Sequence, residues 1–188
     1  MKRIAQAPIL DLIINRWSPR AMDGTPLSDA EIRILIEAAR WAPSSYNNQP
    51  WRFVYAINGD KYFQKFIDIL VPFNQQWANN AGALFIVLSR KNFEYNNKPS
   101  RTHAFDTGAA WENLALQGYS DGLVVHGMEG FDYDKALQLA GGNDEYAVMC
   151  MIAVGHPADK SVLSSELQQR EEPSDRKSFE EIAFYGKM

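Results

Sequence analysis

The chain has 188 residues, of which 46% are hydrophobic and 22% are charged. This length fits one domain that buries roughly 70% of its unfolded surface, so folding requires neither disulfides nor a metal. A formal net charge of −4 argues against the basic surface that nucleic acids and anionic membranes attract. The longest apolar run, near residues 83–88, is much shorter than the roughly 20 residues of a membrane helix. One cysteine, Cys150, permits no internal disulfide, which makes the cytoplasm the expected compartment.

Periodicity and capping signals predict the elements of the first third of the chain. Apolar residues recur at i, i+3 and i+4 within residues 8–15, which predicts a short amphipathic helix. Ser28 and Glu31 form an S-x-x-E capping box, so a second helix begins there, and Pro43 ends it. Apolar residues that alternate over 51–57 predict the first strand.

The later elements are predicted from similar signals. A third helix runs from Phe63 to about Val71, because Pro72 disfavours helical geometry in the residue before it. The polar, asparagine-rich stretch 90–102 predicts a long loop and a candidate lid over a site. The remaining elements follow in order: a buried strand at 83–89, a central helix at 105–118, a strand at 123–126, a glycine turn at 127–130, a helix at 132–140, a strand at 146–154, and an extended tail after Pro157 with one short helix near Phe179. About four strands and six helices indicate a mixed α/β or α+β sandwich, with the strand directions left open.

A first group of candidate binding residues follows the first helix. Arg16, Ser18 and Arg20 stand at two-residue intervals, and the proline before Arg20 favours extended geometry, in which alternate side chains face the same side. Two guanidinium groups and a hydroxyl on one side suit a phosphate. The alternative is a solvated basic turn that pairs with Asp11 or Asp23.

A second group lies between the second helix and the first strand. Residues 42–51 hold two prolines, two serines and three side-chain amides. Rigid backbone and amide groups can recognise a planar heterocycle that has both donors and acceptors. An ordinary loop has the same composition, so that alternative stays open. The flanking Trp41 and Trp51 fit core positions better than ligand stacking.

A third group is the turn at 126–132, where glycines would let a ligand approach backbone N–H groups. A plain tight connection is the alternative. Arg176 and Lys177 could add positive charge to an anion site only if the tail folds back.

Metal and nucleophile chemistry have little support in the sequence. His103, His126 and His156 lack metal-ligand spacing, and Cys150 lies in an apolar strand pattern that predicts an inert thiol. No nucleophile elbow, Walker loop or dinucleotide fingerprint is present. We therefore predict no metal site.

Together and in this order, the groups resemble the FMN-dependent nitroreductase family. The resemblance spans Ile13 to about Lys177. It rests on these motifs: Arg16-Trp17-Ser18-Pro19-Arg20, Ala38 to Ser45 running into Asn47 and Gln49-Pro50-Trp51, Phe73-Asn74 before a short helix, Asp106-Thr107-Gly108 through Asn113-Leu114, Gly127 to Phe131, and Gly155-His156-Pro157.

The resemblance implies a fold and an assembly. The fold would be α+β, a three-layer α/β/α sandwich with about four to five strands in a mainly antiparallel sheet, as one FMN-binding domain over 1–188. The assembly would be a homodimer with FMN at the interface, held by both chains. The tail at 158–188 would wrap the partner subunit.

The resemblance also implies the residues that bind FMN. One subunit would provide the phosphate, ribityl and ring contacts, from Arg16, Ser18, Arg20, Asn74, the backbone N–H groups of Glu129 and Gly130 near flavin N5, and Arg176 or Lys177. The partner subunit would provide Pro43, Ser44, Ser45 and Asn47.

The implied reaction is a ping-pong cycle. NAD(P)H would reduce tightly bound FMN and leave, and a nitroaromatic, quinone or similar small acceptor would take its place. The flavin carries the electrons, so no side chain need be catalytic. The alternatives are a protein that stores or senses FMN without substantial turnover, and a specialised ene-reductase or dehalogenase of the same fold.

Overall fold

The computed structural model describes residues 3–188 and is built around one four-stranded sheet. The strands are β1 (Trp51–Ile57), β2 (Ala83–Arg90), β3 (Val124–Met128) and β4 (Tyr146–Gly155). They lie in the order β1-β2-β4-β3, and each neighbouring pair is antiparallel. This sheet settles the strand direction that periodicity left open and confirms the α+β class.

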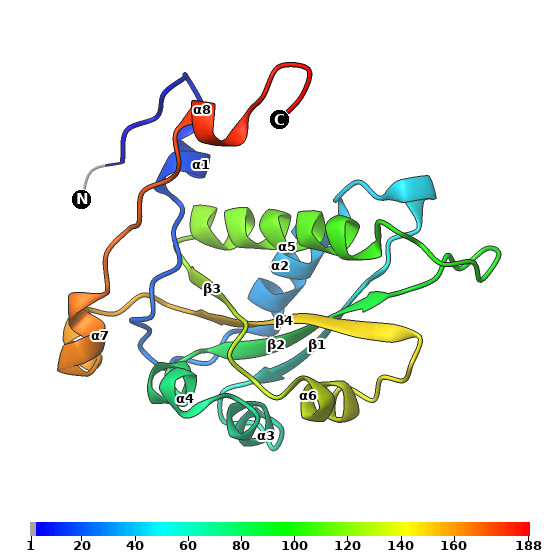
Figure 1. Cartoon of the computed structure of the whole chain (residues 1–188). Coiled ribbons are helices and arrows are strands. Elements are labelled where there is room, and N and C mark those ends of the chain that lie inside the picture. The colour runs from blue at the N-terminus through cyan, green and yellow to red at the C-terminus, as the bar shows by residue number, and fades with distance from the viewer. Residues whose placement is uncertain (1–2) are drawn as a thin grey trace.

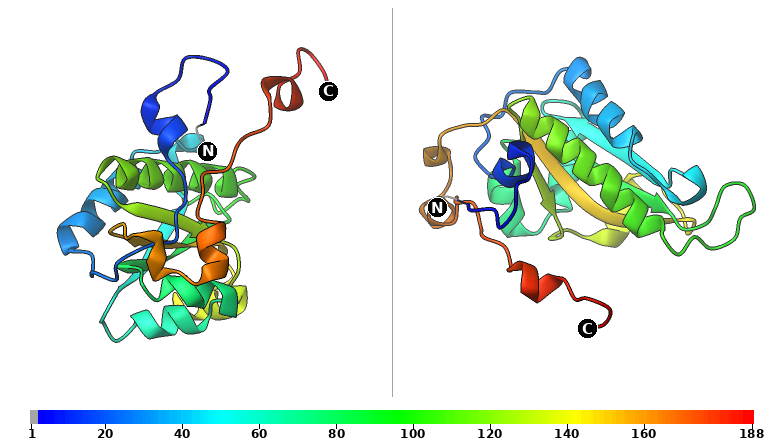
Figure 2. Two further views of the ribbon diagram at one scale, coloured as in Figure 1. Left: turned by 90° about the vertical axis from the view of Figure 1, so that its left-hand side faces the viewer. Right: turned by 90° about the horizontal axis from the view of Figure 1, so that it is seen from above.

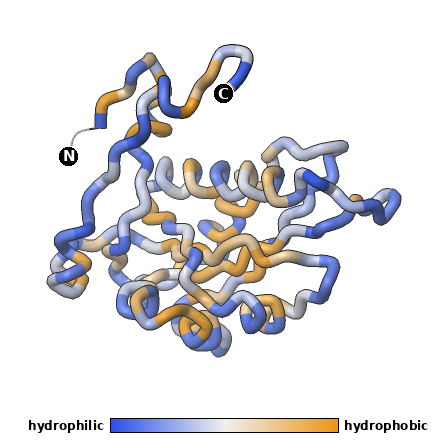
Figure 3. The backbone as a smooth tube through the Cα atoms, in the orientation of Figure 1, coloured by the Kyte–Doolittle hydropathy of each residue, from blue (hydrophilic) through white to orange (hydrophobic). Residues whose placement is uncertain are grey.

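Helices cover both faces of the sheet, which gives three layers (Figure 1). One face carries α2 (Asp29–Arg40) and α5 (His103–Ser120), and the other carries α3 (Phe63–Asp68), α4 (Pro72–Ala78) and α6 (Tyr133–Leu139). The strand β2 is buried along nearly its whole length, and its alternate residues enter two separate apolar clusters, one under each helix layer. Figure 3 shows the hydrophobic residues gathered along the central strands and on the inner sides of the helices. The three-layer sandwich is therefore as predicted.

Capping and periodicity signals in the sequence predicted several helices and strands correctly or within a few residues. Ser28 Oγ accepts the Glu31 N–H, and the Glu31 carboxylate accepts the Ser28 N–H at 2.7 Å, so the predicted capping box forms. The strand β1 has the predicted bounds, and α5 is two residues longer than predicted at each end. The first helix, α1 (Asp11–Asn15), is shorter than predicted, because Leu10 has extended backbone geometry and the helix begins after it.

The predicted helix that begins at Phe63 forms, but it ends at Asp68 and not near Val71. The chain forms α3, breaks at Leu70 and Val71, and starts again as α4 with Pro72 at its first position. Proline is favoured there because the first helical N–H needs no partner inside the helix. Asn74 therefore lies within α4 and not before a short helix, and Trp77 in the same helix is fully buried.

The predicted turn at 127–130 is also corrected, because β3 continues to Met128. Gly127 pairs with Ile152 of β4. A Cβ at Gly127 would lie 3.0 Å from the Trp111 ring, so glycine here serves close packing and not a turn. The connection after the strand begins at Glu129.

The tail after Pro157 holds more structure than predicted. A 3₁₀ turn, η2 (Lys160–Val162), and a short helix, α7 (Ser165–Gln169), precede the predicted helix α8 (Phe179–Ile182). Leu163 and Leu167 are buried against the sandwich, which anchors this part of the tail.

The two ends of the chain leave the sandwich together (Figure 2). Arg3 Nε donates to the Ser174 carbonyl at 3.0 Å, and the Phe179 N–H donates to Gln6 Oε1 at 2.8 Å. Large apolar side chains remain exposed on these arms, including Ile4, Ile182 and Tyr185. Within residues 3–188, no helix is both long and apolar enough to cross a membrane.

Candidate functional site

Residues 16–20, the predicted phosphate segment, show the predicted alternation of side chains. Trp17 and Pro19 line one pocket together with Ala21. Arg16 Nη1 donates to Ser18 Oγ at 3.4 Å, so these two side chains lie together. The segment therefore presents two distinct sides, as alternate positions of an extended chain must.

The arginines of this segment keep unsatisfied donors. Arg16 Nε lies 3.5 Å from the Glu112 carboxylate, and Arg20 Nη1 lies 3.6 Å from the Glu171 carboxylate. The partners are thus not Asp11 or Asp23, as the alternative interpretation required. Among residues 3–188, neither Arg16 Nε nor Arg20 Nε makes a hydrogen bond, although both atoms are buried. Buried donors normally have partners, so an anion beside these groups would complete them.

Glu171 is a residue that sequence reasoning missed. Its Oε1 accepts the backbone N–H groups of Arg20 at 2.5 Å and Ala21 at 2.8 Å. The side chain is only 5% exposed and follows α7 in the tail. The tail thereby fixes the backbone of the phosphate segment.

Arg3 is a second missed residue, and it joins the phosphate segment to the tail. Its Nη1 donates to the Arg16 carbonyl at 2.6 Å, while its Nε binds the Ser174 carbonyl. The pKa of Arg3 lies below its usual value because of burial and then because the cations Arg176 and Arg16 are near. The tail therefore folds back, and Lys177 lines the same groove as Arg3 and Arg176.

Side chains of helix α4 and strand β3 contact the phosphate segment. The His126 ring packs against Trp77 with 4.6 Å between centroids, and its Nδ1 donates to the Pro19 carbonyl at 2.8 Å. The Arg20 guanidinium lies over the Trp77 ring at 6.0 Å. The predicted phosphate segment and α4 are thus neighbours.

Asn74 and Gly130 are in direct contact. Asn74 Nδ2 donates to the Gly130 carbonyl at 3.0 Å. A Cβ at Gly130 would lie 2.7 Å from Asn74 Nδ2 and 2.9 Å from a Val71 methyl, so only glycine lets the turn lie this close to α4. One side of the chain therefore gathers the phosphate segment, Asn74 and the turn that begins at Glu129.

We expect acid to destabilise the protein through His126. Its pKa lies below 6.5, first because burial disfavours the charged ring and also because Arg20 is close, despite the hydrogen bond to Pro19. Above pH 6.5 the ring is neutral in both states; below it, the unfolded chain binds a proton that the folded chain does not, so the free energy of unfolding falls. Urea unfolding between pH 7.5 and pH 5 should show a flatter pH dependence for His126→Asn than for wild type. Equal slopes would contradict this assignment.

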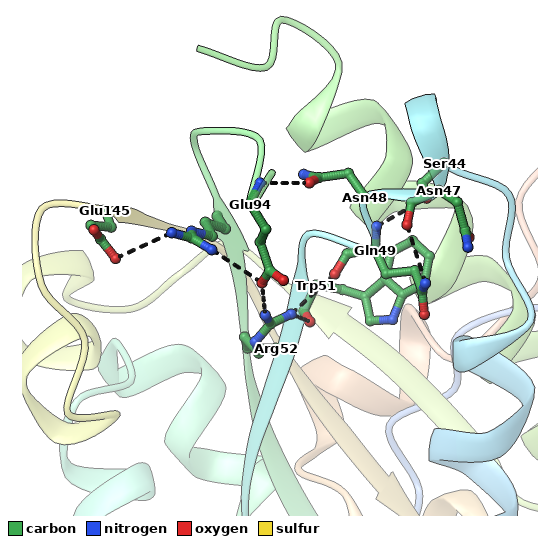
Figure 4. A network of polar contacts seen from close by, with 9 residues as sticks. Ser44, Asn47, Asn48, Gln49, Trp51, Arg52, Glu94 and Glu145 are labelled. Carbon is green, nitrogen blue, oxygen red and sulfur yellow. Dashed lines mark hydrogen bonds and ion pairs between the residues drawn. The ribbon is translucent and has the colours of Figure 1, made fainter. Parts of the chain in front are cut away.

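The segment 44–49 has an unusual backbone. Tyr46, Asn47 and Gln49 have φ values of 52°, 52° and 48°, in the left-handed region that costs a residue other than glycine about 1 to 3 kcal/mol. The Gln49 N–H donates to Ser44 Oγ at 3.0 Å (Figure 4). The Ser45 N–H donates to Asp106 Oδ2 at 3.1 Å. Strain of this kind is concentrated at functional sites.

The single chain does not bring this segment to the phosphate segment. Segment 44–49 lies beside the N-terminal end of α5, whereas α1 and the phosphate segment lie toward its other end (Figure 1).

Of the tryptophans that flank segment 44–49, Trp51 is buried as predicted. The prediction for Trp41 was wrong: its side chain is 72% exposed, and its indole N–H donates to Glu37.

The thiol of Cys150 is a poor nucleophile, as predicted, because burial raises its pKa to about 12. In the part of the chain that the structure describes, no three His, Cys, Asp or Glu side chains are grouped so as to hold a metal ion.

Known proteins resemble this chain in sequence and in fold. Its residues 13–71 and 59–156 match the model of the nitroreductase family. A crystal structure of an oxidoreductase containing FMN shares 40% sequence identity, with a TM-score of 0.94 over 98% of this chain and 95% of that one. A nitroreductase family protein from Streptococcus pneumoniae has a TM-score of 0.74 at 20% identity, over 93% of this chain and 98% of that one. The oxygen-insensitive NADPH nitroreductase of Helicobacter pylori is 37% identical over 90 residues, 47% of this chain and 42% of that protein. With its matched segments covering most of residues 13–156, the chain belongs to the nitroreductase family.

Proposed function

We propose that this protein is an FMN-dependent oxidoreductase that passes a hydride from NAD(P)H to a small acceptor, such as a nitroaromatic or a quinone, in a ping-pong cycle. The observation that carries the proposal is that Arg16 and Arg20 each have a buried Nε donor with no hydrogen-bond partner within residues 3–188. A phosphate offers the acceptors that planar guanidinium groups match best. We propose that this phosphate belongs to FMN, because a similar protein at 40% identity contains FMN.

The residues around these arginines fit the rest of an FMN molecule. Ser18 adds a neutral donor beside Arg16, and the basic cluster of Arg3, Arg176 and Lys177 adds positive charge at the phosphate end. The contacts proposed toward the ring end come from Asn74 and from the backbone of Glu129 and Gly130. Bound FMN would supply the electron-transfer chemistry between donor and acceptor, which the side chains themselves do not provide.

The protein's own side chains and backbone groups would bind FMN and orient it. Asn74 donates to the Gly130 carbonyl, and this contact would hold in place the turn whose backbone N–H groups we propose near the flavin. Trp77 and His126 pack against each other and contact the phosphate segment through Arg20 and Pro19, which holds the segment in place. No side chain is proposed as catalytic.

We further propose a homodimer. Pro43, Ser44, Ser45 and Asn47 would reach the FMN bound by the other subunit, because within one chain they lie away from the phosphate segment. The exposed apolar side chains on the terminal arms support a tail at 158–188 that wraps the partner. We also propose that the chain forms one FMN-binding domain and works in the cytoplasm, where a protein whose single cysteine permits no internal disulfide is expected.

An absorbance spectrum of the purified protein, before and after anaerobic addition of NADPH or NADH, tests the proposal. We expect flavin bands that bleach within seconds, and then recover when a nitroaromatic or a quinone is added. Bands that neither donor bleaches would favour a protein that stores or senses FMN. A protein that remains colourless after incubation with FMN would overturn the proposal. Product analysis with enones and halogenated phenols would identify a specialised reductase.

A further inference from the structure

The segment 44–49 has a strained conformation that contacts from elsewhere in the chain must hold. Three of its residues have left-handed backbone geometry. Its own hydrogen bonds, from the Gln49 N–H to Ser44 and from Gln49 Nε2 to the Asn47 carbonyl, join the segment only to itself. Contacts from other elements hold it against the sandwich. Arg52 of β1 donates to the Gln49 carbonyl at 3.0 Å, and two further contacts come from α5 and from the hairpin that follows β2.

The first contact comes from helix α5. Asp106 is only 4% exposed, and its Oδ2 accepts the Ser45 N–H at 3.1 Å and the Thr102 hydroxyl at 3.2 Å. A hydrogen bond to a buried carboxylate is stronger than one between neutral groups. This contact holds the first half of the segment.

The second contact comes from the hairpin at 91–99, which follows β2. Asn48 Oδ1 accepts the Glu94 N–H at 2.9 Å, and the Glu94 carboxylate binds Arg52 at 2.6 Å and Arg90 at 3.2 Å (Figure 4). The Tyr46 ring also packs against Phe93, with 5.7 Å between centroids. The hairpin therefore holds Tyr46 and Asn48 of the segment. The Ser45 N–H is held by Asp106.

We propose that Asp106 is a positioning residue for the flavin site of the partner subunit, acting through the Ser45 amide. The inference rests on the proposed function, in which Ser44, Ser45 and Asn47 approach that flavin. Asp106 orders the segment before the ligand arrives, which lowers the entropy lost on binding. A residue that served only to stabilise α5 would change the stability of the protein and not the properties of the bound flavin.

The test compares three variants of the full-length protein. Asp106→Ala removes the contact with Ser45, and Asp106→Asn keeps an acceptor oxygen for the same N–H. Thr107→Val is the matched control, because Thr107 is equally buried in α5 but binds Ser89 and the His103 carbonyl instead of segment 44–49. For each variant, the dissociation constant of FMN, the visible circular dichroism and the midpoint potential of the bound flavin are measured.

We expect Asp106→Ala to raise the dissociation constant about tenfold, as loss of one hydrogen bond to a charged group would, and to alter the dichroism and the potential. Asp106→Asn should restore the flavin properties, and Thr107→Val should leave them as in wild type. If Asp106→Ala folds and keeps all three wild-type values, or if Thr107→Val changes them as much, the positioning role is wrong. Wild-type protein that binds no FMN would instead overturn the proposed function, and this inference with it.

Discussion

Replacing Arg20 with alanine should weaken FMN binding by about 1.5 to 3 kcal/mol, the range for a hydrogen bond to a charged group. This corresponds to roughly a 10- to 150-fold rise in the dissociation constant. The physical reason is that Arg20 has one buried donor without a hydrogen-bond partner in residues 3–188, beside the position proposed for the phosphate. Fluorescence titration of the apoprotein with FMN measures the change.

Two further variants separate this effect from others. Arg20→Lys keeps the charge but loses the planar fork of donors, so we expect an intermediate affinity. Arg33→Ala removes an exposed arginine that pairs with Asp29 in the same helix, and it should leave FMN binding unchanged. Unchanged affinity in Arg20→Ala would mean that this segment does not hold the phosphate.

The parts of the fold that the sequence predicted well depend on neighbouring residues. The capping box of Ser28 and Glu31 and the alternation over 51–57 involve partners a few positions apart, so they are visible in any short window. Pro72 shows the limit of such signals, because the same residue that ends one helix is favoured at the start of the next. The residues of the short helix α7 have no helical repeat of apolar side chains that would have predicted it. The burial of Leu167 against the sandwich stabilises this helix instead.

The residues of the candidate site also differ in whether the sequence could predict them. The spacing of Arg16, Ser18 and Arg20 predicted the alternation that the structure has. Arg3 and Glu171 could not be predicted, because their partners lie 171 and 151 residues away along the chain and no periodic pattern links them. A contact at such a separation follows only from the complete fold.

Replacing Glu171 with alanine is expected to lower the free energy of unfolding by about 3 to 5 kcal/mol, the usual cost of removing one partner from a buried ion pair. The change leaves the backbone N–H groups of Arg20 and Ala21 without their acceptor, and the Arg20 side chain without its carboxylate. Urea unfolding followed by far-UV circular dichroism measures the loss. Glu166→Ala, which breaks an exposed pair with Arg170, is the control and should cost about 1 kcal/mol or less.

The double variant Arg20→Ala, Glu171→Ala distinguishes the two roles of Glu171. If its carboxylate chiefly balances Arg20, removing both charges should cost less than the sum of the single changes, because neither is left buried alone. If it chiefly holds the backbone, the losses should add, because the N–H groups at residues 20 and 21 remain unpaired in either background. We expect a shortfall from additivity of about 1 to 3 kcal/mol. Strict additivity would show that the tail holds the phosphate segment through its backbone alone.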